Sequence, residues 1–409
     1  MDSMVPQTGS PGGSRTSDGS PASRRPYLIA DDLTGALDTA AQFAAIRSAP
    51  GPIPVYWRTP PHAALPAGVA IDSGTREATR DEARRRVAAI AAAIVAGVPS
   101  TAGALLYAKL DSLLRGHAGA EIAAWTAATA ADHVIVAPAF PYQGRVTRGG
   151  IQFARGSDGR SWTPAAGDLR ADLEREGRRV QLRSAGEAVP AGISLWDAET
   201  DADLDAIAAA GLALGGRVLW CGSSGLAGAL ARRMGGGGDA APPWLPPSPL
   251  RPVLGLFGTN HPAMAAQLAA CQEHVLTLPD GGPAAATVLA RRLDQAGIAL
   301  ATLGLPDGLT RADAALRIER EFARLVRRLD PPGTLLVAGG ETLRGLCLAL
   351  EAERLDLDGH VWPGVPCSVL RGGRFDGVRV ISKSGAFGDP ALLRRLLAPG
   401  APPHQGEQA

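Results

Sequence analysis

The sequence contains very little lysine or asparagine. Of its 41 basic residues only Lys109 and Lys383 are lysine, and Asn260 is its single asparagine. In a chain so rich in arginine, a lysine can mark a position where a compact ammonium is needed and a guanidinium fork does not fit. On composition alone, chance survival of two lysines is an equally good explanation. Both lysines and the asparagine lie in short polar motifs, and this favours a functional reason.

The few cysteines and histidines argue against several kinds of metal site. The seven histidines are scattered and no His-Glu-x-x-His motif occurs, so a histidine-based metal site is not expected. The formal net charge of +1 gives no reason to expect a nucleic acid partner. The cysteines form no Cys-x-x-Cys pair, which predicts a reducing, cytoplasmic compartment and no structural zinc. They are Cys221, Cys271, Cys347 and Cys367.

No segment has the pattern of a signal peptide or a membrane span. One uncharged stretch, residues 87–108, is interrupted by Gly97, Pro99 and Gly103. We therefore predict a helix, a turn and a strand there, in a soluble protein without a membrane partner. Residues 1–26 are rich in Ser, Gly, Pro and Asp and lack an apolar run. This composition predicts a disordered leader, and we expect a disordered tail at the other end, in residues after 398.

Short apolar runs alternate with amphipathic stretches along the chain, which predicts an α/β fold with parallel strands and helical crossovers. A length of 409 residues favours two domains and leaves three open. Four glycines at 235–238 and six prolines up to Pro252 predict a linker over 235–252. We therefore predict a first domain at 27–234 and a second at 253–398. Each is built on a largely parallel sheet flanked by helices, with the active site in the cleft between them.

The predicted elements follow from the apolar pattern. Strands are expected at 27–30, 53–57, 69–71, 104–108, 134–137, 194–196, 218–221, 253–257, 334–338 and 378–382. Helices are expected at 79–95, 118–128, 203–212, 343–353 and 391–397. Ligands of such folds bind outside the carboxyl ends of the strands, so the residues that follow these strands are the candidates for a site.

Two adjacent carboxylates, Asp31 and Asp32, follow the first predicted strand. Apolar residues at helical spacing come next, so Asp32 or Thr34 is expected at the N-cap position. A strand that ends in acids and turns into a helix places those acids at the ligand-binding edge of the sheet. The alternative is that one Asp caps the helix and the other is solvated, although one helix needs only one cap.

A second polar motif runs from Lys109 to Arg115, directly after another predicted strand. Lys109 and Arg115 suit a carboxylate, while Asp111 and Ser112 suit hydroxyl groups. The set therefore fits an anionic, hydroxylated ligand. The alternative is an ordinary ion pair on the surface, which would stabilise the fold only slightly.

Two glycine-containing loops of the first domain differ in the ligands that they predict. The loop 138–150 contains two prolines and three glycines, which give it a defined shape, and it offers Arg145 and Arg148 to an anion. The stretch 222–228 has the look of a dinucleotide fingerprint. It lacks the acidic residue expected about twenty positions later, because the chain there enters the linker, so a nicotinamide cofactor is not expected.

Three strand ends of the second domain carry small residues before helix starts. Backbone N–H groups in such turns cradle phosphate. No GxxxxGK[ST] motif occurs, so none of them is a Walker loop. Three such turns on one sheet, one of them with a lysine, predict a nucleotide phosphate site. The turns are Gly258-Thr259-Asn260, Gly339-Gly340-Glu341-Thr342 and Lys383-Ser384-Gly385.

Together these motifs resemble the four-carbon acid sugar kinases, a family that phosphorylates threonate, erythronate or an oxo-tetronate from ATP. The resemblance covers nearly the whole chain apart from the leader, the linker and the tail. It implies a first domain that binds the sugar acid and a second that binds the nucleotide, with ATP and Mg²⁺ as cofactors. The matching stretches are 29–36, 109–116, 138–150, 219–225, 339–342, 363–366 and 383–390.

The resemblance also implies roles for residues. Asp32, or as weaker candidates Asp31 or Asp111, would orient the substrate hydroxyl or accept its proton. Lys383 would face the phosphates with Mg²⁺ bridging them, and the metal ligands stay unknown. The resemblance implies that the acid meets Asp31, Asp32, Lys109, Asp111, Arg115 and Arg145, and the motif after the strand 104–108 adds Ser112. The resemblance implies that ATP meets Thr259, Gly339, Gly340, Glu341, Thr342 and Gly385, and the three turns themselves add Gly258, Asn260, Lys383 and Ser384.

Two departures from the family pattern limit these expectations. Gly258-Thr259-Asn260 stands where Gly-Ser is expected, and His117 stands where asparagine is common. The second departure leaves the identity of the acid open, including a branched or five-carbon oxo sugar acid. A two-domain acid-binding protein and a dehydrogenase are the alternatives from other classes, and a homodimer stays open.

Overall fold

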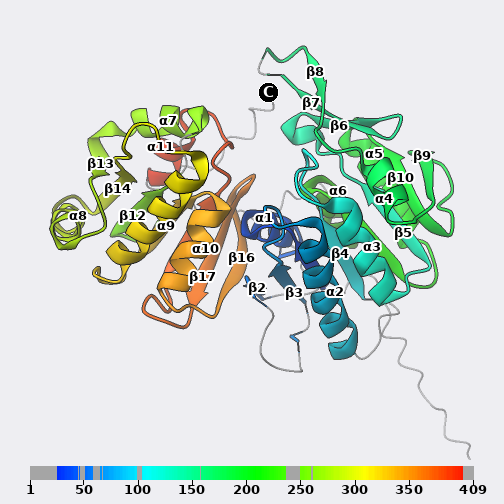
Figure 1. Ribbon diagram of the computed structural model, residues 1–409, viewed down its shortest axis with the longest axis horizontal. Helices are drawn as coiled ribbons and strands as arrows, with labels where there is room; N and C mark the ends of the chain where they lie inside the picture. Colours follow the sequence, from blue (N-terminus) through cyan, green and yellow to red (C-terminus); the bar gives the residue numbers. More distant parts are fainter. Residues whose placement is uncertain are drawn as a thin grey trace, which may run out of the picture.

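The computed structural model describes residues 25–44, 46, 51–58, 65–66, 68–98, 104–156, 158–235, 249–258 and 261–398. Fifteen strands form one continuous sheet flanked by helices, and three more form a small antiparallel sheet. Figure 1 shows the two halves of the chain side by side, the first coloured blue to green and the second yellow-green to red. None of the helices in the described ranges combines the length and the apolarity that crossing a membrane requires.

The first half of the large sheet is parallel throughout, as the alternation of strands and helices predicts. Its strands, in spatial order, are β2 (Ile53–Tyr56), β3 (Val69–Asp72), β1 (Pro26–Ala30), β4 (Leu105–Lys109), β11 (Val218–Gly222), β5 (His133–Ala137), β10 (Gly192–Asp197) and β9 (Val180–Ser184). One face packs against α1 (Leu33–Ala44), α5 (Asp201–Leu212) and α6 (Ser224–Met234). The other packs against α2 (Arg80–Gly97), α3 (Ala118–Thr129) and α4 (Leu169–Arg175).

The second half has five parallel strands followed by an antiparallel hairpin. The strands, in spatial order, are β13 (Val275–Leu278), β14 (Ile298–Leu303), β12 (Val253–Phe257), β15 (Thr334–Ala338), β18 (Arg379–Lys383), β17 (Val365–Arg371) and β16 (Arg354–Trp362). Helices α8 (Pro283–Ala296), α9 (Arg311–Val326) and α10 (Gly340–Ala349) cover one face. Helices α7 (Pro262–Ala269) and α11 (Leu392–Leu397) cover the other.

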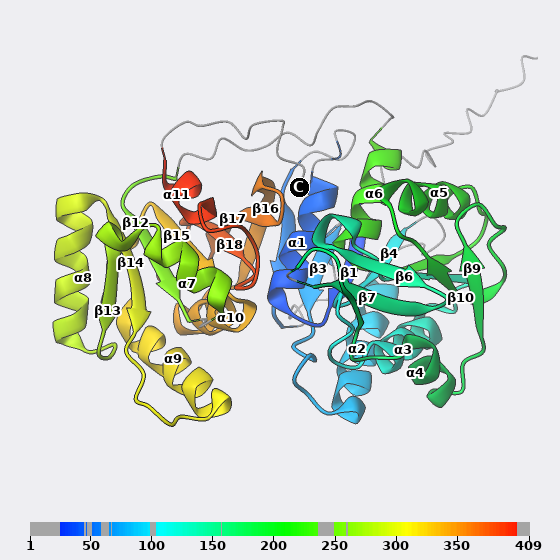
Figure 2. The same ribbon diagram turned by 90° about the horizontal axis from the view of Figure 1, so that it is seen from above.

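In the described part of the chain, one pair of strands joins the two halves of the sheet. β16 runs antiparallel to β2, and Leu355 lies opposite Val55. Helix α1 of the first half packs against β16, and Figure 2 shows them next to each other between the halves. One apolar core, lined on its helical side by α1, α6, α9 and α10, runs through both halves. The sequence pattern predicts two largely parallel sheets but carries no signal that an antiparallel pair fuses them.

Several predicted bounds are wrong. The predicted loop 138–150 contains a short 3₁₀ turn (Pro141–Gln143) and the strand β6 (Arg145–Arg148). β6 pairs with β7 (Ile151–Arg155), which pairs with β8 (Trp162–Pro164) in the small sheet. Helix α10 begins at Gly340 rather than 343, because Gly339 adopts a φ of +102° and turns the chain directly into the helix. It ends at Ala349, and Glu351 just beyond it has a left-handed φ of +59° that is incompatible with helix to 353.

Candidate active site

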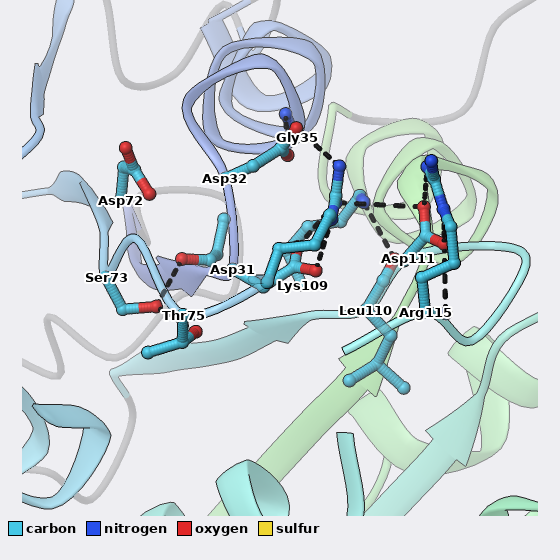
Figure 3. Close-up of polar contacts among 12 residues, drawn as sticks. Asp31, Asp32, Gly35, Asp72, Ser73, Thr75, Lys109, Leu110, Asp111 and Arg115 are labelled. Atoms are coloured by element: carbon cyan, nitrogen blue, oxygen red, sulfur yellow. Dashed lines mark hydrogen bonds and ion pairs between the residues drawn. The ribbon is translucent and has the colours of Figure 1, made fainter. Parts of the chain in front are cut away.

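The first group of polar side chains gathers where three neighbouring strands end. β1 lies between β3 and β4 in the sheet, so the residues that follow these strands meet at one edge. Figure 3 shows side chains from the three loops pointing toward one another in this place. Two of the three loops, those after β1 and β4, carry candidate residues that the sequence predicts.

Arg76, from the loop after β3, is the central cation of this group. Its Nε and Nη2 each donate a 2.7 Å hydrogen bond to the Asp31 carboxylate, and Nη1 donates one of 2.5 Å to Asp32 Oδ2. Its Nη2 also lies 3.7 Å from Asp111 Oδ1. Burial alone would lower the pKa of Arg76, but Asp31 and Asp32 raise it on balance, so the guanidinium stays charged.

Asp31 and Asp32 have different surroundings although they are adjacent. Asp32 Oδ1 accepts a 2.7 Å hydrogen bond from Gly35 N, so it caps α1, and Thr34 lies inside the helix. Asp31 is not solvated, because it is 3% exposed and holds Arg76 with both oxygens. Burial, opposed by Arg76, raises the pKa of Asp31. The alternative in which one Asp only caps the helix and the other faces water is therefore wrong in its second part.

Asp111 pairs with Arg115, the other end of its own motif. Arg115 Nε donates to Asp111 Oδ2 at 2.7 Å and Nη2 donates to Oδ1 at 2.9 Å. Although burial opposes it, the two arginines around Asp111 hold its pKa far below its ordinary value. Asp111 is therefore an ionised carboxylate whose oxygens are already engaged by its own chain. Arg115 is half exposed on its outer side.

Lys109 lies between the two carboxylate loops. Its side chain is almost fully buried and its Nζ donates to the Leu110 carbonyl at 2.7 Å. A Cβ built on Gly35 would lie 3.1 Å from Lys109 Nζ and 2.7 Å from Asp32 Oδ1. The close approach of ammonium, capping carboxylate and α1 therefore requires glycine at position 35. This crowded site is where a compact ammonium suits better than a guanidinium fork.

The remaining predicted residues of the first half lie around this centre. Ser112 accepts a hydrogen bond from Gln152 through its backbone carbonyl. The Arg145 guanidinium donates to the Gln143 carbonyl, and burial lowers the pKa of Arg145. Asp111 and Arg115 are near enough to affect that pKa. His117 precedes α3 and its ring contacts the Ala78 carbonyl at 2.7 Å, so it supports the loop before α2.

The buried hydroxyl groups of Ser73 and Thr75 link the end of β1 to Glu121 on α3. Ser73 Oγ donates to the Ala30 carbonyl and contacts Thr75 Oγ1 at 2.7 Å. Thr75 Oγ1 in turn donates to the Glu121 carboxyl on α3 at 2.5 Å. Burial raises the pKa of Glu121 to about 7. Neighbouring Asp72 is also buried, and its pKa is likewise raised to about 7.

The second group of predicted residues lies at the strand ends of the other half. Gly258 follows β12, and Gly339 with Gly340 connects β15 to α10. A Cβ on Gly258 would lie 2.4 Å from Thr342 Oγ1, so the first turn packs directly on the start of α10. Glu341 is exposed beside it. The predicted Thr259 and Asn260 lie outside the described residues.

Lys383 ends β18 and is completely buried. Its Nζ donates to the Ser384 carbonyl at 2.9 Å and lies 3.7 Å from Met264 Sδ at the start of α7. Burial lowers the pKa of Lys383 to about 8. Its backbone carbonyl accepts from Gly339 N, so the lysine turn and the α10 turn are hydrogen-bonded neighbours. Ser384 and Gly385 lie on its outer side.

The two groups meet at the beginning of α10. A Cβ on Gly340 would lie 2.7 Å from Thr34 Oγ1 and 3.2 Å from Asp32 Oδ2. The helix N-terminus of the second half, with its unpaired backbone N–H groups and positive dipole end, is thus in contact with the capped start of α1. Asp32 is the predicted carboxylate that faces this junction directly.

The residues present fit a nucleotide with Mg²⁺. The turn at Gly339 has a φ of +102°, and among the described residues a Cβ there would have only Thr342 Oγ1 within 4 Å, at 3.7 Å. This open turn has the form that a phosphate cradle requires. In the described residues no group of three His, Cys, Asp or Glu is arranged to hold a metal ion alone. Mg²⁺ in phosphoryl-transfer sites is held by one or two carboxylates together with phosphate oxygens. Asp32 and Glu341 are near enough for the Asp32 charge to affect the pKa of Glu341.

Sequence reasoning missed several residues at the junction. Arg76 lies in the loop after the predicted strand 69–71, for which the sequence predicts no role. Loops at the ends of adjacent parallel strands meet, and this rule could have indicated Arg76. Arg344 on α10 reaches Asp72 in the first half, with 3.5 Å between Nη1 and Oδ2. His360 on β16 lies 3.6 Å from Asp38 on α1. The last two contacts span the two halves, and nothing in the local sequence indicates them.

Comparison with known proteins gives a separate family model for each half of the chain. A sugar-binding N-terminal domain model matches residues 27–168, and a nucleotide-binding C-terminal domain model matches residues 253–393. A protein from Salmonella typhimurium and one from Haemophilus influenzae have the same fold, with TM-scores of 0.69 and 0.66 at 20% and 18% identity. The matches cover 91% and 90% of this chain and 98% of each of those chains.

Curated relatives span almost the full chain. A D-threonate kinase from Cupriavidus necator is 34% identical over 90% of this chain and 95% of its own length. A D-threonate kinase from Bordetella bronchiseptica is 31% identical over 90% and 96%. A D-erythronate kinase from Heliobacterium modesticaldum is 26% identical over 88% and 94%. The chain belongs to the four-carbon acid sugar kinase family.

Proposed function

We propose that the protein is a cytoplasmic, ATP-dependent kinase that phosphorylates the terminal hydroxyl of a four-carbon sugar acid such as threonate or erythronate. Residues 27–234 would bind the acid and residues 253–398 the nucleotide. The observation that carries the proposal is the contact between the start of α10 and Asp32, because it brings a phosphate-type cradle against a carboxylate.

Asp32 is the proposed base because one of its oxygens lies against the start of α10. Asp31 is held by two donors of one guanidinium, and Asp111 is held in the same way by Arg115. Asp32 gives one oxygen to the helix cap and the other to a single Arg76 nitrogen. Its second oxygen faces α10. We infer that Asp32 orients the substrate hydroxyl there and takes its proton.

The cations of the first half suit the carboxylate of the acid. Lys109 Nζ and Asp32 Oδ1 both lie beside Gly35, and half-exposed Arg115 is near enough for the Asp32 charge to affect its pKa. The two cations would therefore hold the acid group while its far hydroxyl approaches α10. Ser112 and Arg145 at the rim would contribute further polar contacts. Arg76 holds Asp31 and Asp32 in place through hydrogen bonds and lies beside Asp111, without competing for the substrate.

The second half supplies groups for the nucleotide. The N–H groups at the start of α10 would face the phosphates, and Lys383, buried behind the edge, would act on them through its charge. Glu341 would help to ligate Mg²⁺. ATP with Mg²⁺ provides the phosphoryl group and neutralises part of its charge. The chain contributes orientation and a fixed electrostatic field, which supply most of the catalysis in this class of reaction.

The test is to incubate the purified protein with MgATP and a panel of sugar acids and to measure ADP release. The panel includes both stereoisomers of threonate and of erythronate, together with oxo-tetronate and branched and five-carbon oxo acids. ADP release that depends on a four-carbon acid is the expected result. Release with a five-carbon or branched acid alone would reassign the substrate. Binding of acid without any ADP release would overturn the kinase proposal.

A further inference from the structure

Arg344 belongs to the second half of the chain but ends in the first. It lies on α10, one helical turn after Gly340. Its Nη2 donates to the Trp57 carbonyl at 3.3 Å, just beyond β2. Its Nη1 lies 3.5 Å from Asp72 Oδ2, at the end of β3. One side chain therefore ties the start of α10 to two strand ends of the sugar-binding half.

The loop after β3 is shaped to receive this guanidinium. A Cβ on Gly74 would lie 2.0 Å from Arg344 Nη1 and 2.7 Å from its Cζ. Gly74 also has a left-handed φ of +61°, and its N–H donates to Asp72 Oδ1 at 2.7 Å. Glycine here gives both the turn and the room, so the guanidinium can approach the backbone of the loop closely.

This loop also carries Arg76, two residues after Gly74. Arg76 holds Asp31 and Asp32, and the backbone of Thr75 and Arg76 donates to the Asp31 carbonyl. A continuous path of contacts thus runs from α10 through Arg344 and the loop to the carboxylate cluster. α10 touches the first half a second time at Gly340, beside Asp32, so both ends of the path lie in the active site.

We propose that Arg344 is a positioning residue that fixes the loop 72–76, and through Arg76 the catalytic carboxylates, in register with the phosphate-binding start of α10. The inference rests on the proposed kinase function and adds a residue that contacts neither substrate. An ordinary surface ion pair would not need this geometry. Asp72 is almost completely buried, and the space for the guanidinium depends on a glycine.

The first experiment measures both kinetic constants of Arg344→Ala. Each ligand keeps its own half of the site, so we expect KM for ATP and for the acid to stay within about 3-fold. Turnover should fall roughly 10- to 100-fold, the scale of a misplacement of about 1 Å. Arg344→Lys keeps a cation for Asp72 but loses the flat fork, and should show a smaller loss. Arg320→Ala is the matched control, since Arg320 is an exposed arginine on neighbouring α9 that pairs with Glu321.

A double-mutant cycle tests the contact from the opposite side. Gly74→Ala pushes a methyl group into the guanidinium and should lower turnover by a similar factor. In the Arg344→Ala background the methyl group has room, so Gly74→Ala should lower turnover much less there than in the wild type. Strain from the left-handed φ is present in both backgrounds and cancels in the cycle. Losses that multiply instead, or a wild-type turnover for Arg344→Ala, would overturn the proposal.

A readout without turnover separates this inference from the kinase assignment. Hydrogen exchange of a peptide covering residues 69–79 reports on the loop directly. We expect ADP binding to protect this peptide in the wild type and in Arg320→Ala, but not in Arg344→Ala. Equal protection in all three proteins would contradict the positioning role even if the chain is a kinase. If ADP protects this peptide as expected but no assay yields a phosphorylated acid, the positioning role of Arg344 stands and the proposed kinase function fails.

Discussion

The two halves of the sheet present opposite chemistry at equivalent edges. The strands of the first half end in charges, with Asp31, Arg76, Lys109 and Asp111 packed into one network. Those of the second half end in glycines and backbone N–H groups, and their one lysine is buried behind the edge. The fold places loops at the same edge in both halves, so ligand class is set by what the loops contain.

The difference matches what each ligand needs. A small acid with hydroxyl groups offers few atoms, so charged and polar side chains must recognise it individually. A nucleotide brings several phosphate oxygens, and an open helix start with small residues accommodates them as a group. The following substitutions test this contrast, from the largest expected effect to the smallest.

Asp32→Asn should have the largest effect, because it removes the proposed base from the charged edge while keeping its shape. An Asn oxygen still accepts from Gly35 N, so the helix cap survives. Turnover should fall by roughly two to four orders of magnitude, with ATP binding nearly intact by calorimetry. Asp168→Asn, at the cap of α4, is the control. Near-normal turnover in folded Asp32→Asn would reduce Asp32 to a cap.

Gly340→Ala places a methyl group between the two edges, 2.7 Å from Thr34 Oγ1. Either α10 or α1 must shift, so kcat/KM should fall about 100-fold. Gly345→Ala on the same helix is the matched control. Its methyl group would meet only the flexible Glu319 side chain, and alanine favours helix there. Equal activity of the two variants would show that the junction tolerates side chains and would weaken the division into two edges.

The two lysines test the contrast residue by residue. Lys109→Met keeps the volume of the buried stem and removes the charge, and should raise KM for the acid by about 10- to 100-fold. Lys383→Met should instead raise KM for ATP and lower turnover. Steady-state kinetics with each substrate varied separates the two outcomes. Arginine at both positions with unchanged kinetics would mean that the scarcity of lysine is accidental.

Glu121 should give the charged half a pH dependence of stability. Its pKa of about 7 in the fold lies above the ordinary 4.5. Between these values the folded chain keeps a proton that the unfolded chain releases, so stability is lost as the pH rises through that window. Glu121→Gln keeps the acceptor for Thr75 and removes the titration. Between pH 5 and 8 the Tm of the wild type should drop by roughly 2–4 °C relative to this variant.

The matched control for Glu121 is Glu174→Gln, which changes a half-exposed carboxylate on α4. Its Tm should follow the wild type across the same pH range. Parallel curves for the wild type and Glu121→Gln would mean that the carboxyl keeps an ordinary affinity for protons despite its burial.

The sequence was sufficient for the parts of the site that lie next to their own strands. Asp31, Asp32, Lys109 and Asp111 follow apolar runs that form β1 and β4, so a local pattern was enough to find them. The same reasoning predicted the parallel halves, because alternating strands and helices leave few other topologies. The turn at Gly339 was found in the same way, although its helix begins three residues earlier than predicted.

Contacts between distant segments left no local signal. Arg344 and Asp72 lie far apart in the chain, and neither belongs to a motif that indicates a contact with the other. The hairpin of β16 and β17 and the strand β6 were also missed. β6 follows a Pro- and Gly-rich stretch typical of a loop, and forms because β7 supplies its hydrogen-bond partners. Such features depend on tertiary pairing, which overrides local propensity.

The antiparallel pair of β2 and β16 has a consequence for synthesis of the chain. Val55 pairs with Leu355, 300 positions later, and at roughly 5–20 residues per second these leave the ribosome about 15–60 s apart. Throughout this interval β16, the strand that covers the outer edge of β2 in the finished sheet, has not yet been made. An open strand edge is a template for pairing with other chains. The nascent sugar-binding half is therefore most exposed to misassembly until the hairpin of the second half arrives to close it.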